Sequence, residues 1–207
     1  MRLIGMLDSP YVRRVAISFD FLALPFVHEP VSVFSTFERF QSINPVVKAP
    51  SLVCGNGDVL MDSSLILQYA EAALTDGDSL WSREAATLQR EMRAVSLALA
   101  ACDKSVQIVY ERKLRPASAQ YEPWMDRVRG QMLAAYTALD AELGAHAEVY
   151  DAPRSQACIT AAVVWQFTQS MLAAMVPTEN FPNIEELSMR MEETPAFLRY
   201  PPTGPGV

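Results

Sequence analysis

A stretch bracketed by two prolines constrains the fold of this chain more than any other feature. It runs from Asn44 to Pro50, reads NPVVKAP, and is followed at once by the apolar run 51–54. Proline has a fixed φ and no N–H, so Pro50 is excluded from a central strand but suits a strand's first position. An X–Pro bond is also the one peptide bond for which cis costs little, and a cis bond here would turn the backbone of Ala49 outward, toward a ligand. Taken alone, the stretch also fits an ordinary proline loop before a strand.

The residues on either side of this stretch predict a small α/β domain. Ser9 falls at an N-cap and Pro10 in the first turn of a helix, because apolar residues recur at helical spacing from Val12 onward. Gly55-Asn56-Gly57-Asp58 is a strong hairpin signal between two apolar runs. The predicted strands cover 2–6, 26–33, 51–54 and 59–61, and the predicted helices begin at 10, 34 and 63.

The second part of the chain has a different, wholly helical pattern. Apolar residues step by three and four over 88–109 and again over 125–143, which predicts two long amphipathic helices separated by Pro116. Residues 157–167 are apolar on nearly every side, as in a helix buried within a bundle. Shorter helices are predicted over 183–191 and 195–198. We therefore expect two domains, residues 1–78 and residues 82–207.

Composition and charge exclude several classes of protein. The chain has 207 residues, is 50% hydrophobic and 20% charged, and carries a net charge of −7, which opposes binding to nucleic acid. No segment reaches the ~18 apolar residues of a membrane span, and the apolar start is too short for a signal peptide. We expect a cytoplasmic protein with neither nucleic acid nor membrane as a partner.

Neither the cysteines nor the histidines suggest a metal site. Cys54, Cys102 and Cys158 are widely spaced and outside any metal-type spacing, so each is expected to be a buried small hydrophobe. His28 and His146 have no carboxylate or cysteine partner in the sequence that would indicate a site. No metal is expected.

Taken in order, these features resemble the cytosolic glutathione S-transferases, and among them the bacterial serine-type members. The likeness rests on Ser9-Pro10-Tyr11 at a helix start, the NPVVKAP stretch, the hairpin, Asp62-Ser63 at a second helix start, and the helical second part. The resemblance implies an N-terminal thioredoxin-like domain with a mixed four-stranded sheet and a C-terminal helical bundle. Glutathione would lie in the cleft between them, and no metal would be required.

The resemblance assigns the chemistry to Ser9. The thiol of glutathione is mostly protonated at neutral pH, and a helix N-terminus with one hydroxyl donor can stabilise its thiolate. The alternative is that Ser9 is a plain N-cap, worth about 1 kcal/mol. Position 9 is not the cysteine of relatives that form mixed disulfides, and Met6 stands where many animal relatives carry a catalytic tyrosine.

Other residues of the resemblance would hold the rest of glutathione. Asp62 and Ser63 would bind the ammonium and carboxylate of the γ-glutamyl end, although such a pair is commonly a simple cap. The backbone of Ala49, before Pro50, would pair with the cysteinyl unit. Lys48 would reach the glycyl carboxylate, or is only a solvated charge.

The second substrate and the helical part are less constrained. Pro10, Tyr11, Tyr110 and Trp165 are candidates for an apolar electrophile pocket, although aromatic residues on helices are commonly core. Ser155 resembles the family's buried N-cap, but Cys158 stands where an aspartate is usual, which should weaken that cap.

Two function classes follow. The first is an enzyme that activates glutathione at Ser9 and transfers its sulfur to an electrophilic small molecule. The second is a glutathione-binding or protein-binding module on the same fold with little or no turnover. In either class the resemblance implies a two-fold homodimer.

Overall fold

The computed structural model describes residues 1–204. The described residues form two compact units, one from Met1–Leu80 together with residues 194–204, and one from Trp81–Glu193. The first boundary lies close to the expected one. The last helix differs from the expectation, because it packs with the N-terminal unit although the sequence pattern placed it with the helical one.

The N-terminal unit is built on a mixed four-stranded sheet, as predicted. Its strands lie in the order β2 (Val27–Glu29), β1 (Arg2–Ile4), β3 (Ser51–Val53) and β4 (Val59–Met61). β1 is parallel to β2 and antiparallel to β3, which is antiparallel to β4. β1 ends earlier than expected because Gly5 has a φ of 140° and turns the chain away.

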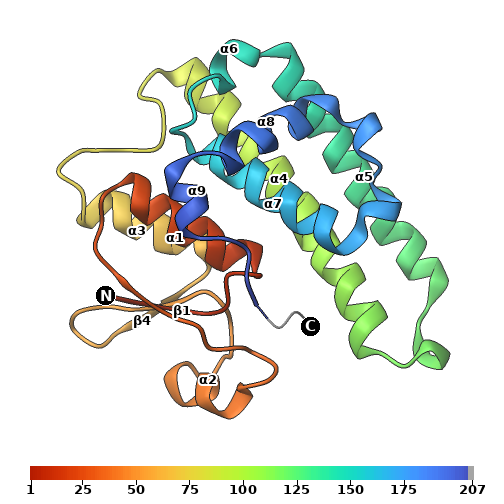
Figure 1. Ribbon diagram of the computed structural model, residues 1–207, viewed down its shortest axis with the longest axis horizontal. Coiled ribbons are helices and arrows are strands. Elements are labelled where there is room, and N and C mark those ends of the chain that lie inside the picture. Colours follow the sequence, from red (N-terminus) through yellow and green to blue (C-terminus); the bar gives the residue numbers. More distant parts are fainter. Residues whose placement is uncertain (205–207) are drawn as a thin grey trace. The chain divides into compact units, whose positions relative to one another are not determined.

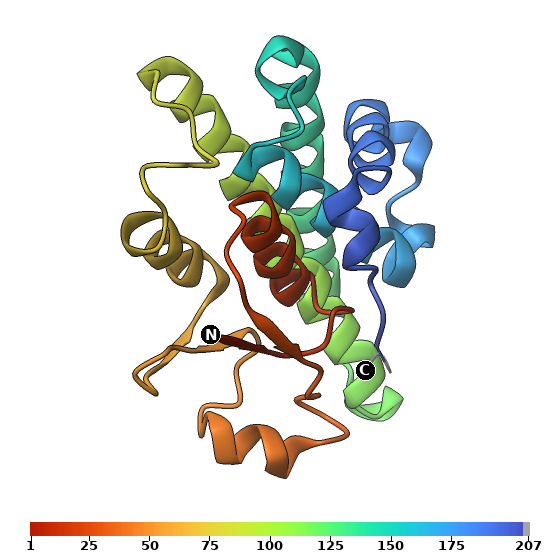
Figure 2. The same ribbon diagram turned by 60° about the vertical axis from the view of Figure 1, so that its left-hand side comes forward.

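Helices cover both faces of this sheet. Helices α1 (Pro10–Phe21) and α3 (Ser63–Ala73) lie on one face, and α2 (Phe37–Ile43) lies on the other (Figures 1 and 2). Successive residues of a strand point to opposite faces. Leu3 and Leu52 accordingly join the core under α1 and α3, while Ile4 packs with Phe40 of α2.

The C-terminal unit is helical, as predicted. The long helices α4 (Ala85–Leu114) and α5 (Glu122–Ala145) pack together, and α7 (Gln156–Leu172) packs against α4 and α8 (Pro182–Glu192). Residues Gln156–Met175 are apolar and long enough to cross a membrane. Because 61% of an 18-residue stretch within this segment is buried inside the protein, the segment is a core helix. The shorter elements are α6 (Ala147–Tyr150) and the 3-10 turns Ala117–Ala119, Ala173–Met175 and Thr178–Asn180.

A chain of three buried hydroxyls links the long helices of this unit. Ser105 of α4 lies 2.9 Å from Thr168 of α7, and the hydroxyl of Tyr136 on α5 donates to the same Thr168 oxygen. All three side chains are fully buried. Burial also raises the pKa of the Tyr136 phenol. The core of the helical unit therefore contains one polar chain whose members satisfy one another.

The start of α7 retains half of the expected capping arrangement. The Ser155 hydroxyl accepts from the Cys158 N–H at 3.1 Å. The Cys158 thiol interacts with the Ser155 side chain and lies 3.5 Å from the carbonyl oxygens of Tyr150 and Ala152. The thiol thus adds contacts to the preceding residues that a carboxylate, which has no hydrogen to donate, could not make.

Helix α9 (Pro195–Arg199) packs on α1 within the N-terminal unit. The buried Arg13 side chain donates to the carbonyl oxygen of Tyr200 at 2.8 Å, and its guanidinium lies 5.1 Å from the ring centre of Phe197. Arg199 pairs with Asp20 at 2.7 Å. These long-range polar contacts explain why the last helix joins the N-terminal unit.

Candidate functional site

Ser9 occupies the N-cap position of α1, as the sequence predicts. Its backbone is extended, with φ −73° and ψ 120°, and Pro10 follows in the first turn. The Ser9 hydroxyl makes no side-chain capping bond to the helix. Because Pro10 has no N–H, this helix start offers one amide donor fewer than usual. The hydroxyl of Ser9 therefore adds a donor at a place where the helix dipole favours an anion.

The loop before β3 is held by buried polar contacts. The Asn44 side chain donates to the Ser51 hydroxyl at 2.8 Å, and that hydroxyl donates to the Lys48 carbonyl at 2.8 Å. Asn44 and Ser51 are both buried, and the Ala49–Pro50 bond is cis. Within residues 1–204, neither the N–H nor the carbonyl of Ala49 has a hydrogen-bond partner. Apart from the position of Asn44 in the NPVVKAP stretch, nothing in the sequence pattern indicated that its side chain anchors this loop.

Gly5 lets this loop approach the start of α1. A Cβ atom on Gly5 would lie 2.5 Å from a methyl group of Val12 and 3.3 Å from the Cβ of Ala49. Any larger residue would clash there, and the φ of 140° at Gly5 also favours glycine. The Ala49 loop and the first turn of α1 are therefore close neighbours in the same unit.

Asp62 and Ser63 lie at the start of α3, as expected. Asp62 has a φ of 72°, and its carboxylate accepts from the N–H groups of Ser64 at 2.9 Å and Leu65 at 3.4 Å. The Lys48 ammonium lies 3.5 Å from the other Asp62 oxygen. The structure thus brings Lys48 and Asp62 together. A non-glycine residue at positive φ is uncommon and draws attention to a local functional constraint.

Arg14 is a site residue that the sequence pattern did not reveal. Its guanidinium is buried and donates to the hydroxyls of Ser63 at 3.1 Å and Ser64 at 3.0 Å. Since the Ser63 oxygen accepts from Arg14, its own hydrogen is oriented away and available to an acceptor. The only signal was the pair of consecutive arginines, Arg13 and Arg14, between apolar residues of the helix.

The candidate pocket aromatics have different environments. Pro10 and Tyr11 belong to the first turn of α1, and Tyr110 lies on α4 with 41% of its surface exposed. Trp165 is 1% exposed; its ring packs edge-on against Tyr136, and its N–H donates to Glu185. This environment favours the core alternative for Trp165.

The structure offers no metal centre within residues 1–204. No group of three or more His, Cys, Asp and Glu side chains there is arranged to hold a metal ion. The three cysteines are free thiols; Cys102 and Cys158 are buried as expected, whereas Cys54 is only partly buried. The Nε2 of His28 lies 2.8 Å from the Gly5 carbonyl oxygen, a contact that supports the β1–α1 loop.

Comparison with known proteins identifies the N-terminal part of the chain. Residues 3–75 match the family model of the glutathione S-transferase N-terminal domain. A search of curated proteins found no match. The matched residues contain β1, α1, the loop before β3 and the start of α3, which together carry the candidate site.

Solved structures match the whole chain. A glutathione transferase family member from Pseudomonas fluorescens, solved with bound glutathione, is 26% identical with a TM-score of 0.85, over 98% of this chain and 99% of that one. The structure with bound S-(propanoic acid)-glutathione from the same organism gives 25% identity and a TM-score of 0.82, over 100% and 99%. A glutathione S-transferase from Methylobacterium radiotolerans, in complex with glutathione sulfonate, shares the fold at 24% identity and a TM-score of 0.86, over 100% and 96%. Residues 3–75 thus match a glutathione S-transferase N-terminal domain, and the whole chain shares the fold of these glutathione transferases.

Proposed function

We propose that this protein is a serine-type glutathione transferase that stabilises the thiolate of glutathione at Ser9 and joins it to an electrophilic, apolar small molecule. The observation that carries the proposal is the Ser9 hydroxyl, which lies at the N-terminus of α1 without a capping bond. A hydroxyl that is not used by the helix can donate to a sulfur anion. The helix dipole adds to the stabilisation of that anion.

The start of α3 supports recognition of the γ-glutamyl end. That end is a zwitterion, and Asp62 offers a carboxylate for its ammonium. The Ser63 hydroxyl accepts from Arg14 at 3.1 Å, so its hydrogen can be donated to the ligand's carboxylate. The positive charge of Arg14 then acts on that carboxylate through the Ser63 hydroxyl. Arg14 is a positioning residue in this scheme, and Ser63 makes the contact.

The loop before β3 would hold the rest of the tripeptide. The unpaired N–H and carbonyl of Ala49, before Pro50, suit a backbone pairing with the cysteinyl unit. The Lys48 side chain is 52% exposed, and its flexible stem lets the ammonium turn toward the glycyl carboxylate. The family member from Pseudomonas fluorescens supports glutathione as the ligand, since it was solved both with glutathione and with S-(propanoic acid)-glutathione.

The chemical step transfers the sulfur without a metal or an oxidant. The thiol loses its proton to solvent, and the thiolate attacks the electrophilic carbon. The carbon–sulfur bond forms as the bond to a leaving group such as chloride breaks with its electron pair. Pro10, Tyr11 and Tyr110 are the candidates for contact with this substrate. Three free cysteines suit a reducing cytoplasm, where we place the reaction.

The experiment that tests the proposal compares the parent with Ser9→Ala. The ultraviolet absorbance of the thiolate should titrate at higher pH in the variant, and the rate with chlorodinitrobenzene should fall. One hydrogen bond to a charged group is worth about 1.5–3 kcal/mol, or roughly ten- to a hundredfold in rate. Glutathione affinity should change little, because the bond is stronger to the thiolate than to the thiol. An unchanged titration and rate would reduce Ser9 to a structural residue.

A parent protein that binds glutathione but turns over no electrophile would favour the binding-module alternative. Calorimetry with glutathione gives that binding constant independently of turnover. The two measurements together separate a failed catalytic assignment from a failed binding site.

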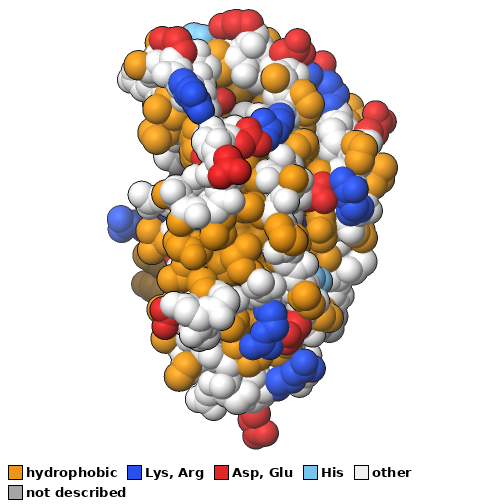
Figure 3. Space-filling view, turned by 90° about the vertical axis from the view of Figure 1, so that its left-hand side faces the viewer, with side chains coloured by type: hydrophobic (Ala, Val, Ile, Leu, Met, Phe, Trp, Pro, Cys, Tyr) orange, Lys and Arg blue, Asp and Glu red, His pale blue; other side chains and the backbone are white. Residues whose placement is uncertain are grey.

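We also propose that the protein is a homodimer that uses the outer surface of α3 and β4. Leu65 and Tyr69 of α3 are 60% and 36% exposed, and Val59 and Met61 of the edge strand β4 are each 37% exposed. Figure 3 views the side on which α3 lies and shows hydrophobic side chains gathered there. An exposed apolar surface beside an unpaired strand edge suits a partner with the same surface.

Sedimentation tests this assembly. The Leu65→Lys variant should sediment as a 23.0 kDa monomer at micromolar concentration, because the substitution places a charge within the apolar surface of α3 and β4. Phe37→Lys on α2, where the parent phenylalanine is 46% exposed, is the matched control and should leave the assembly intact. A parent that sediments as a monomer throughout would contradict the dimer.

A further inference from the structure

The last described residues, Pro201–Gly204, form a segment that we name the C-terminal arm. The arm leaves from a fixed point on α1, since Arg13 donates to the Tyr200 carbonyl at 2.8 Å. The Tyr200 ring also stacks on Phe26, with ring centres 5.7 Å apart. The root of the arm is therefore anchored to the N-terminal unit by a buried arginine and an aromatic contact.

The arm itself is short and stiff. Its two prolines have fixed φ angles, so little backbone freedom is lost when the segment is ordered. The Thr203 N–H donates to the Pro201 carbonyl at 2.8 Å, which closes a tight turn. This turn brings Gly204 back toward the chain that precedes α1.

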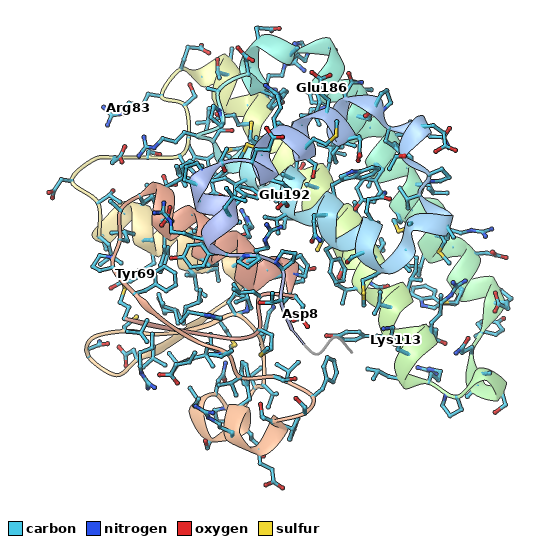
Figure 4. The ribbon with its side chains drawn as sticks, viewed as in Figure 1. Asp8, Tyr69, Arg83, Lys113, Glu186 and Glu192 are labelled. Carbon is cyan, nitrogen blue, oxygen red and sulfur yellow. The ribbon has the colours of Figure 1, made fainter. Side chains whose placement is uncertain are left out.

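Gly204 packs directly against Asp8. A Cβ atom on Gly204 would lie 2.1 Å from the Asp8 Oδ2 atom and 2.2 Å from its Cγ atom, so only glycine fits without displacing the carboxylate. Figure 4 labels Asp8 at the beginning of α1. Asp8 precedes Ser9 in the chain. The arm therefore ends one residue away from the hydroxyl that we assign to the sulfur.

We infer that Asp8 and Gly204 hold the C-terminal arm beside the sulfur and thereby set an upper limit on the size of the electrophile. The inference rests on the proposed function. An electrophile has to reach the sulfur from a side that neither glutathione nor α1 occupies, and the arm, which packs against the residue before Ser9, would cover one of those sides. The site accordingly selects compact electrophiles and rejects those with an additional fused ring.

The test removes the arm and compares two electrophiles of different size. A chain that ends at Tyr200 loses residues 201–207 but keeps a main-chain oxygen of Tyr200, now in the terminal carboxylate, for Arg13 to bind. Chlorodinitrobenzene serves as the compact substrate, and chlorodinitronaphthalene as the bulky one. The ratio of kcat/KM for the bulky over the compact substrate should rise about tenfold or more, the discrimination that steric fit in a pocket commonly supplies. The thiolate titration of bound glutathione should stay that of the parent.

A point variant keeps the inference falsifiable if the shortened chain folds poorly. Gly204→Ala places a Cβ where the Asp8 carboxylate lies, so the contact that holds the arm is disturbed, and the same ratio should rise by a smaller factor. Gly130→Ala on α5 is the matched control, because a Cβ there meets nothing within 4 Å. It should leave the ratio unchanged.

Three outcomes decide between this inference and the function beneath it. A raised ratio with an unchanged titration supports the arm as a specificity element. An unchanged ratio in both variants, or an equal loss with both substrates, overturns the inference while the proposed function stands. If the parent protein shows neither a thiolate titration of bound glutathione nor turnover of any electrophile, both the inference and the proposed function are wrong.

Discussion

Two serines start helices in the two units of this protein, and they are used differently. Ser155 begins α7 in the helical unit, and its hydroxyl accepts from the Cys158 N–H at 3.1 Å. Ser9 begins α1 in the N-terminal unit with an extended backbone as well, but its hydroxyl makes no capping bond. The same residue type at the same helix position is thus structural in one unit and available for chemistry in the other. Capping, rather than residue type, separates the two roles.

The start of α3 combines both roles. Asp62 caps α3 through the Ser64 and Leu65 N–H groups, and its second oxygen faces Lys48. A carboxylate has enough acceptor sites to cap a helix and to bind a ligand's ammonium at the same time. A serine N-cap hydroxyl that accepts a capping bond can still donate its single hydrogen, but the bond fixes its orientation; without one, the Ser9 hydroxyl can turn away from the helix.

Among the variants that test this comparison of helix starts, substitutions of Asp62 are expected to have the largest effect, which is on glutathione affinity. In the proposed site, Asp62→Ala removes a charged hydrogen bond to glutathione and should weaken binding by about 1.5–3 kcal/mol, measured by calorimetry. Asp62→Asn is the informative control. Asparagine tolerates the positive φ and still caps the helix, so its loss of affinity reports the charge alone. Affinity equal to that of the parent in both variants would remove Asp62 from the site.

A smaller effect is expected at Ser155. Ser155→Ala removes a buried capping bond and should lower the free energy of unfolding by about 1 kcal/mol, within the range of 0.5–2 found for such caps. Denaturant unfolding without glutathione measures it. Ser155→Asp, which keeps an acceptor for the Cys158 N–H, should recover part of the loss. A neutral Ser155→Ala variant would contradict the structural role of this serine.

Cys158, whose N–H donates to Ser155, makes a pH-dependent contribution to the free energy of unfolding. Burial raises the pKa of the Cys158 thiol above its ordinary value, so the folded state keeps the thiol neutral at a pH where the unfolded chain ionises. The stability of the parent should therefore fall as the pH rises above about 8.5, by less than the 1.4 kcal/mol per pH unit that one proton allows. Cys158→Ala should lack this component. Parallel pH profiles for parent and variant would contradict it.

The smallest effect on stability is expected at Ser9. Because no capping bond is lost, Ser9→Ala should change the free energy of unfolding by no more than about 0.5 kcal/mol without glutathione. The same denaturant titration as for Ser155→Ala gives the matched value. A loss as large as that of Ser155→Ala would show that both serines are caps, and the comparison would fail.

Local patterns in the sequence predicted most of the fold. Helical spacing identified α1, α4, α5 and α7, and the hairpin signal at Gly55 to Asp58 placed β3 and β4. The helical start at Ser9 and the strand start after Pro50 were also predicted correctly. These features depend on neighbouring residues, which a sequence pattern contains. Strands β1 and β2 are shorter than expected because turns end them before their apolar runs do.

Long-range contacts could not be predicted in this way. Arg13 and Arg14 are consecutive arginines in a helix, and nothing in their spacing reveals that one binds Tyr200 and the other binds Ser63. The return of α9 to the N-terminal unit depends on those same side chains. The free hydroxyl of Ser9 was likewise beyond the pattern, since serine at an N-cap predicts a capping bond that the structure lacks.

The three buried hydroxyls of the helical unit also fix how its helices can slide. Ser105, Tyr136 and Thr168 come from α4, α5 and α7, and their contacts with one another require the present axial register, although Ser105 also donates to the Ala101 carbonyl of its own helix. A shift of one helix by a single turn would leave polar groups unpaired in the core, at about 1–3 kcal/mol for each. Purely apolar seams would tolerate such slippage more readily. The three hydroxyls therefore help to specify the axial register of the helices. An apolar redesign of this core would have to replace all three residues together, and the shape of the new side chains alone would have to specify that register.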